Sequence, residues 1–188
     1  MAIRTTEAVI LRVWPFRTSS LIVTAFTRDF GKIQGLAKGI RLRCSRKDKK
    51  YNCFLEPLTL NKIVYYEKKR PVLYSITQCD LLNQFQPVRQ DLKKLGTASF
   101  MLELVDKGTQ LEDNDRDIFK LLVSSLSRLC EDGNDLKEIL LFFQMQFLKL
   151  SGFMPKDNKL NMSVMDFIRL HIASDFKTLE FMEKIKNG

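Results

Sequence analysis

The first 82 residues carry short runs in which apolar and polar side chains alternate, the pattern of β-strands. β-Branched and aromatic residues are frequent in these runs, which predict five strands, over residues 6–14, 19–27, 32–37, 55–67 and 72–80. Gly31 ends a predicted turn at 28–31, and Gly35 and Gly39 suit sharp bends or the close approach of another strand. Five strands joined by short turns predict a small closed or partly open barrel.

After residue 86, apolar residues recur at three- and four-residue steps, which predicts helices. The predicted helices cover residues 87–107, 115–131, 135–152 and a last stretch at 163–186 that restarts near Asp175. Asp135 and Glu138 would form a capping box, and Gly133 and Gly152 would end the helices before them. The helix at 135–152 is apolar nearly all round, so it is either central in its bundle or covered on one face by a partner. The predicted class is α+β, with a barrel domain over 1–82 and a helical domain over 83–188.

Basic residues are concentrated in the first half of the 188-residue chain, whose net charge is +9. Residues 1–80 hold 16 Lys and Arg against 6 Asp and Glu, whereas residues 81–188 hold 15 against 16. This asymmetry favours a polyanion as partner, most often nucleic acid. An anionic membrane surface is the rival, but the basic half has no amphipathic basic helix to lie on it.

Three groups of basic residues are candidates for contact with phosphates. The longest group follows the third strand, beside a tyrosine that offers a stacking surface. A second group precedes the fifth strand, and two arginines flank Trp14 and Phe16, although Trp14 itself is expected in the core. The candidates are Lys38, Arg41, Arg43, Arg46, Lys47, Lys49, Lys50 and Tyr51, then Lys68, Lys69 and Arg70, and finally Arg12 and Arg17.

Motifs for catalysis, cofactors and metals are absent from the sequence. The four cysteines are 9, 26 and 51 residues apart and the only histidine is His171, so no zinc-binding spacing occurs. Phosphate-binding glycine loops and hydrolase motifs are missing. The acidic residues at 112–117 suit a solvated helix start. We therefore expect a protein that is not an enzyme and needs no cofactor or metal. Because it lacks a long apolar run and a signal peptide, we expect it in the cytoplasm.

The order of these features resembles the bacterial RecO family. The similar stretches are Glu7–Arg12, Ser19–Lys32, Gly35–Arg41, Leu55–Leu58, Ala98–Asp106 and Leu150–Pro155. The most specific are Phe-Thr-Arg-x-x-Gly-Lys at 26–32 and Gly-x-Ala-Lys-Gly at 35–39. The resemblance implies an oligonucleotide-binding (OB) barrel followed by a helical domain. On the matching motifs it also implies a DNA-binding role for Arg28, Lys32, Lys38 and Arg41.

RecO-like proteins act in the RecF pathway of DNA repair and homologous recombination. They bind single- and double-stranded DNA and anneal complementary strands. With RecR they help to load RecA onto DNA coated by the single-stranded DNA-binding protein SSB, whose acidic C-terminal tail they bind. Tail binding implies an apolar pocket with nearby cations in the helical half. The candidates there are Lys120, Arg128, Phe142, Met145 and Lys149. The resemblance places such a protein in the bacterial cytoplasm, at the nucleoid.

One departure from the family is the stretch after Pro155. Many members carry a four-cysteine zinc module there, whereas residues 156–161 follow here and no cysteine occurs after Cys130. We expect the zinc module to be absent and the last helix to be joined directly.

Two other functions stay open. One is an RNA-binding OB protein of the translation machinery, which competition between RNA and single-stranded DNA would identify. The other is a scaffold whose basic half binds an acidic protein.

Overall fold

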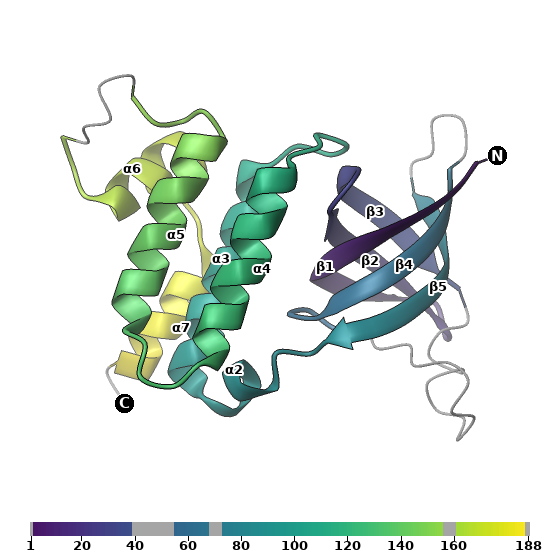
Figure 1. Ribbon diagram of the computed structural model, residues 1–188, viewed down its shortest axis with the longest axis horizontal. Coiled ribbons are helices and arrows are strands. Elements are labelled where there is room, and N and C mark those ends of the chain that lie inside the picture. The colour runs from purple at the N-terminus through teal and green to yellow at the C-terminus, as the bar shows by residue number, and fades with distance from the viewer. Residues whose placement is uncertain (1, 39–54, 68–72, 156–160, 187–188) are drawn as a thin grey trace. The chain divides into compact units, whose positions relative to one another are not determined.

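A computed structural model describes residues 2–38, 55–67, 73–155 and 161–186 (Figure 1). The chain divides into two compact units. The first unit contains Met1–Gln84 and Gln110–Arg116, and the second contains Phe85–Thr109 and Asp117–Gly188. The barrel unit therefore includes a segment that comes from between two helices of the second unit.

The first unit is a closed five-stranded barrel. Its strands are β1 (Ala2–Phe16), β2 (Ser20–Thr27), β3 (Gly31–Ala37), β4 (Leu60–Glu67) and β5 (Tyr74–Asn83). They are hydrogen-bonded in the order β1-β2-β3-β5-β4, and β4 pairs with β1 to close the barrel. Each of these pairs is antiparallel except β3 with β5. This is the topology of an OB barrel, which confirms the predicted fold class.

The predicted start of the fourth strand at residue 55 is wrong. Leu58 has a φ of 62°, a left-handed conformation that interrupts an extended chain, and β4 begins only at Leu60. Residues of this stretch instead bond to the middle of β1. The Leu58 N–H donates to the Ile10 carbonyl at 3.1 Å, and the Ile10 N–H donates to the Thr59 carbonyl at 2.9 Å.

Alternation along the strands forms the barrel core, because every second side chain of a strand points inward. The core contains Ala8, Ile10, Val23, Ala25, Ile33, Ala37, Leu55, Ile63, Tyr65, Ile76 and Cys79. Gly35 faces this core where β3 lies against β5, and a Cβ there would lie 2.6 Å from Cδ1 of Ile76. The predicted close approach at Gly35 is therefore confirmed, whereas Gly39 lies outside the described residues.

The β2–β3 turn at residues 28–30 is held by the side chain of Thr27. Its hydroxyl donates to the Gly31 carbonyl at 2.8 Å and accepts from the Phe30 N–H at 3.0 Å. Gly31 has a φ of 63°, so the turn uses the conformational freedom of glycine. Most of the motif at 26–32 thus builds this turn.

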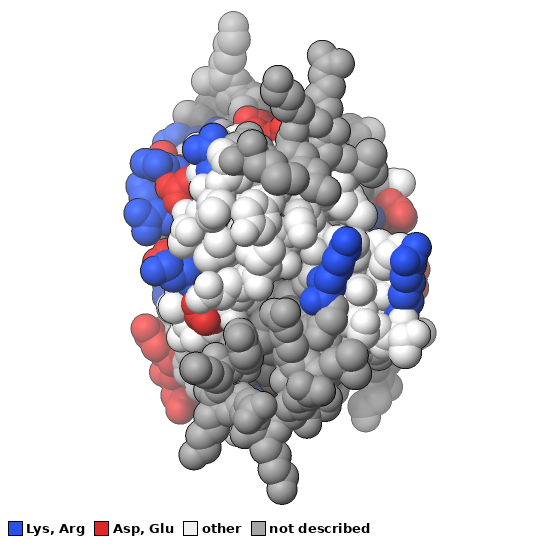
Figure 2. Space-filling view, turned by 90° about the vertical axis from the view of Figure 1, so that its right-hand side faces the viewer, with Lys and Arg blue, Asp and Glu red and all other residues white. Residues whose placement is uncertain are grey.

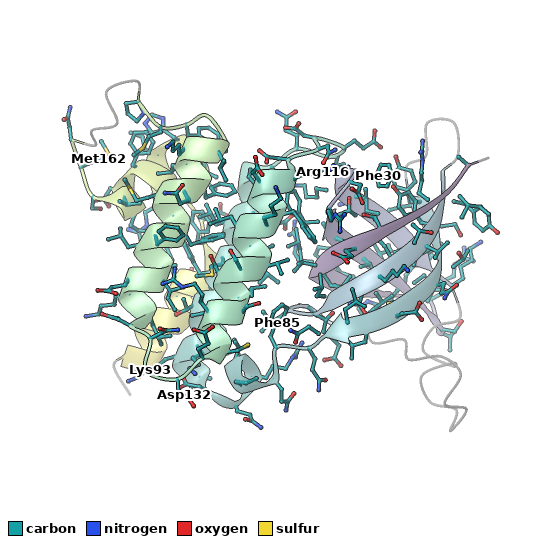
Figure 3. The ribbon with its side chains drawn as sticks, in the orientation of Figure 1. Phe30, Phe85, Lys93, Arg116, Asp132 and Met162 are labelled. Atoms are coloured by element: carbon teal, nitrogen blue, oxygen red, sulfur yellow. The ribbon has the colours of Figure 1, made fainter. Side chains whose placement is uncertain are left out.

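The segment Gln110–Arg116 packs against the same turn. The Glu112 N–H donates to the Lys32 carbonyl at 2.8 Å, and the Tyr74 hydroxyl donates to the Glu112 carboxylate at 2.5 Å. Arg116 lies beside the turn that carries Phe30, and its guanidinium donates to Asp29 at 2.9 Å (Figure 3). These contacts place Glu112 on the barrel, whereas the sequence predicted only a solvated helix start there.

Helices form the second unit, and the chain passes between the two units after residues 84, 109 and 116. The described helices are α2 (Gln86–Gln90), α3 (Leu92–Gly108), α4 (Arg116–Cys130), α5 (Leu136–Leu150), α6 (Val164–His171) and α7 (Lys177–Lys186). The single helix predicted over 87–107 is interrupted at Asp91, whose carboxylate caps α3 by accepting from the backbone N–H groups of Lys93 and Lys94. Among the described residues, no helix is long and apolar enough to span a membrane.

Helix ends follow the predicted signals with one difference. Gly133 and Gly152 adopt φ values of 84° and 73° at the ends of α4 and α5. Asp135 caps α5, but it accepts from the N–H of Lys137 at 2.8 Å, one residue before the position that a capping box with Glu138 uses.

The carboxylate of Glu103 on α3 anchors the start of α7. It accepts from the N–H groups of Lys177 and Thr178 at 3.0 Å each and from the Thr178 hydroxyl at 2.6 Å. The Lys107 ammonium group lies 3.4 Å from it. Burial raises the pKa of Glu103, but the donors from Thr178 and Lys177 and the charge of Lys107 outweigh this, so the pKa lies below its ordinary value of 4.5.

Gly31→Ala tests the packing of Gln110–Arg116 on the barrel, with Gly133→Ala as the matched control. Both glycines have positive φ, but a Cβ at Gly31 would collide with the Asp113 backbone, whereas none of the described atoms lies within 4 Å of a Cβ at Gly133. We expect Gly133→Ala to lower the free energy of unfolding by about 1–2 kcal/mol through the backbone alone. Gly31→Ala should cost a further ~1–3 kcal/mol through the collision. Urea unfolding measures both, and equal costs would contradict the packing.

Glu103→Gln tests the anchor of α7. A carboxylate whose pKa is lowered by folding stabilises the protein above its unfolded pKa, and this contribution is lost as the pH falls through the folded pKa. We expect Glu103→Gln to be about 1–3 kcal/mol less stable than the wild type at pH 7. The difference should shrink as the pH falls below 4.5. Urea unfolding across that range measures it, and a difference independent of pH would refute the role of the charge.

Candidate nucleic-acid interface

The strand register places the β1–β2 turn, the end of β3 and the start of β5 at one end of the barrel. Phe16 pairs with Ser20 across the β1–β2 turn, and the next pair in β2, Leu21 with Ala37, is at the end of β3. At the same end, Gly35 pairs with Tyr74 at the start of β5. The first turn, the departure of the chain after β3 and its entry into β5 are therefore neighbours. In OB folds, the first turn and the loop between the fourth and fifth strands are the usual ligand-binding elements.

Arg12 and Trp14 lie on the outside of the barrel. A β-bulge between Ile10 and Arg12 shifts the alternation of β1 by one residue, so Val13 packs against the core and Trp14 does not. Trp14 is 44% exposed, and the Arg12 guanidinium carbon lies 4.9 Å from the centroid of its ring. The expectation that Trp14 belongs to the core is wrong, because the sequence pattern does not reveal the bulge.

Arg17 and Lys38 are exposed at the loop end of the barrel. The Arg17 guanidinium carbon lies 5.4 Å from the centroid of the Phe16 ring. This end of the barrel thus offers cations beside aromatic rings, which is the combination that single-stranded nucleic acids require. Figure 2, which faces the barrel, shows described Lys and Arg side chains at the left edge and in the right half, with Asp and Glu side chains among them and uncharged surface between.

Arg28 and Lys32 lie at the opposite end of β3, beside the β2–β3 turn. The Arg28 guanidinium is 3.5 Å from the Glu7 carboxylate and 3.9 Å from that of Asp29. Lys32 is only 9% exposed. The seven residues of β3 span about 20 Å. The structure therefore separates these two predicted residues from Arg17 and Lys38, and it gives Lys32 little contact with solvent.

The other predicted DNA contacts lie outside the described residues. They are Arg41, Arg43, Arg46, Lys47, Lys49, Lys50, Tyr51, Lys68, Lys69 and Arg70.

The helical unit exposes an apolar face on α5. Phe143 is fully buried, whereas Leu141 and Phe142 are 51% and 47% exposed, so α5 is not surrounded on all sides. Of the predicted partner-binding residues, Arg128 and Phe142 are in contact, with the guanidinium carbon 5.5 Å from the ring centroid. Met145 is half-buried and Lys149 is exposed. Lys120 is exposed and forms an ion pair with Asp117 at 2.9 Å.

Groups that could hold a metal or act as nucleophiles are scattered over the described ranges. No group of three or more His, Cys, Asp or Glu side chains suitable for a metal occurs there. The buried thiol of Cys79 donates to the Asn61 side-chain oxygen at 3.2 Å. Burial raises the pKa of the Cys130 thiol, which disfavours a reactive thiolate. His171 packs against Phe167, with ring centroids 4.2 Å apart.

Substitution of two adjacent phenylalanines of α5 tests which face of this helix is exposed to solvent. Phe143→Ala should lower the free energy of unfolding by about 3–5 kcal/mol because it leaves a cavity. Phe142→Ala should cost at most ~1 kcal/mol, the value of an exposed contact with Arg128. Urea unfolding of both variants compares them directly. A cost at Phe142 near that at Phe143 would show that the exposed face is covered.

Comparison with known proteins gives the same family along most of the chain. Residues 1–85 match the family model "Recombination protein O N terminal", and residues 89–159 match "Recombination protein O C terminal". The chain is 34% identical over 150 residues to the DNA repair protein RecO of Syntrophus aciditrophicus, a match that covers 80% of this chain and 56% of that protein. The RecO proteins of Caldicellulosiruptor saccharolyticus and Syntrophobacter fumaroxidans are 31% and 34% identical over 150 residues, covering 80% of this chain and 59% and 57% of theirs. The chain thus spans less than two thirds of the length of these relatives.

Proposed function

The chain belongs to the RecO family of DNA repair proteins, and from this premise we propose that it is a mediator of DNA repair and homologous recombination. In this proposal it binds single- and double-stranded DNA and anneals complementary strands. With RecR, it assists the loading of RecA on single-stranded DNA that is coated by SSB. The protein forms and breaks no covalent bond in these steps.

The observation that carries the proposal is the loop end of the OB barrel. Arg17 and Lys38 are exposed there, and the Arg17 guanidinium lies over the Phe16 ring. Further along β1, on the outside of the barrel, the exposed Arg12 lies over the Trp14 ring. Cations that follow a phosphate backbone release counterions, which drives binding and makes it sensitive to salt. The aromatic rings add a stacking surface that accepts any base. Both features suit binding without sequence preference, as annealing of arbitrary strands requires.

Annealing follows from charge neutralisation. Two complementary strands repel each other through their phosphates, and a basic surface that holds both of them lowers this repulsion. The charge excess of residues 1–80 supplies that surface. Arg28 contributes less in this proposal, because Glu7 and Asp29 already neutralise its guanidinium. Lys32 is left out of the DNA-binding surface because it is buried.

Recruitment to coated DNA is assigned to the exposed face of α4 and α5. An acidic peptide with apolar side chains fits a surface where exposed rings and cations are adjacent, and Phe142 with Arg128 form such a pair. Lys149 on α5 is a second exposed cation, in addition to Arg128 of α4, and Met145 adds adaptable apolar surface. In this proposal, Lys120 has a smaller role because Asp117 neutralises it.

The experiment is annealing of two complementary single strands, bare and coated with SSB, across a series of salt concentrations. We expect faster annealing that fades with salt on both substrates. Lys38→Ala should lower affinity equally for all sequences and flatten the salt dependence of single-strand binding by about 0.7 in logarithmic slope, the value of one phosphate contact. Lys62→Ala, which removes an exposed lysine from β4, is the matched control and should leave the slope unchanged.

Results of this experiment separate the parts of the proposal. An unchanged slope in Lys38→Ala would remove the loop end of the barrel as the DNA contact. Phe142→Ala should slow annealing on coated strands and leave annealing of bare strands intact. Equal rates on both substrates in that variant would overturn the assignment of the α4–α5 face. If the wild type accelerates annealing on neither substrate at low salt, the mediator function is wrong.

A further inference from the structure

A pocket of about 450 Å³ opens beside the β1–β2 turn. Its size falls in the range of sites that hold small ligands. The described residues that line it belong to the turn and the adjoining ends of β1, β2 and β3. They are Phe16, Arg17, Thr18, Ser19, Ser20, Leu36 and Lys38.

The lining combines three kinds of chemistry. Phe16 and Leu36 supply apolar surface, and the Arg17 guanidinium lies over the Phe16 ring at 5.4 Å. Aromatic rings and guanidinium planes both stack on nucleobases. Thr18 and the two serines supply hydroxyl groups, and Lys38 supplies an exposed ammonium group for a phosphate.

We propose that this pocket takes up one unpaired nucleotide of a DNA strand, which deepens the proposed function and rests on it. The base stacks against the Phe16–Arg17 pair, and the phosphate lies beside Lys38. A base within a duplex is stacked and paired, so it does not enter such a pocket without being extruded. The pocket therefore gives the barrel a preference for single strands, which phosphate contacts alone would not give because a duplex has the higher charge density.

The backbone of Arg17 makes a clean test possible. Arg17 has a φ of 53°, a left-handed conformation that glycine adopts freely and that is uncommon for other residues. Arg17→Gly removes the guanidinium and relieves the backbone at the same position. We therefore expect thermal unfolding of this variant at a temperature equal to or above that of the wild type, so a change in binding will not result from misfolding.

The binding experiment uses fluorescence anisotropy with a single strand of about 12 thymidine nucleotides, within the site size of OB folds, and with a duplex of the same length. Arg17→Gly should weaken binding to the single strand about tenfold, the loss expected for one stacked base. Its effect on the duplex should be smaller and no larger than that of Lys38→Ala, because only one phosphate contact is lost there. Equal losses on both substrates would overturn the proposal and leave general DNA binding intact.

A second arm replaces the thymidines with abasic sites in the same strand. The wild type should lose affinity, because the phosphates remain and the stacking partners are gone. Arg17→Gly should show no further loss, so that the two changes are not additive. Additive losses would show that bases stack elsewhere and would overturn the proposal that a base stacks in this pocket. If the wild type binds neither strand nor duplex, the proposed function fails together with the pocket.

Discussion

The candidate interface depends on the pairing of β2 with β1 and with β3, and the parallel pairing of β3 with β5 continues the same closed barrel. The pairing is short, running from Gly35 with Tyr74 to Ala37 with Ile76. It brings Gly35 so close to β5 that a Cβ there would lie 2.6 Å from Cδ1 of Ile76, whose side chain would have to move. The contact brings the start of β5 beside the end of β3, which already adjoins the β1–β2 turn. Phe16, Arg17 and Lys38 meet at this end because β2 pairs with β1 on one side and with β3 on the other.

The basic residues of the two family motifs, at 26–32 and 35–39, lie at opposite ends of β3. Arg28 and Lys32 belong to the turn at which Gln110–Arg116 packs, where Glu7 neutralises Arg28 and burial removes Lys32 from solvent. Lys38, from the second motif, is exposed at the other end of β3 beside Arg17. A strand of seven residues is long enough to separate the turn from the end of the barrel that carries the proposed DNA contacts. Arg28 and Lys32 thus lie at the turn, at the end of β3 away from Lys38.

The helical unit shows the same division between packing and surface chemistry. Phe143 fills the interior, whereas its neighbour Phe142 lies outside under the guanidinium of Arg128. The charged network around Glu103 fixes α7 on α3 and leaves the α5 face untouched. The exposed face of α5 is thus separate from the packed interior, so substitutions there can test the proposed recognition without unfolding the protein.

The sequence by itself determined the number and order of the strands, the helical second half, the glycine at the close approach and most helix ends, because alternation, helical spacing and capping are local properties. Its motifs also indicated the family. It did not determine the exposure of Trp14, since a bulge in β1 reverses the alternation. Nor did it determine the burial of Lys32 or the place of Glu112 on the barrel, since both depend on contact between two segments about 80 residues apart in the chain. The pocket beside Arg17 was decided by tertiary structure alone, because only strand register brings Leu36 and Lys38 to the β1–β2 turn.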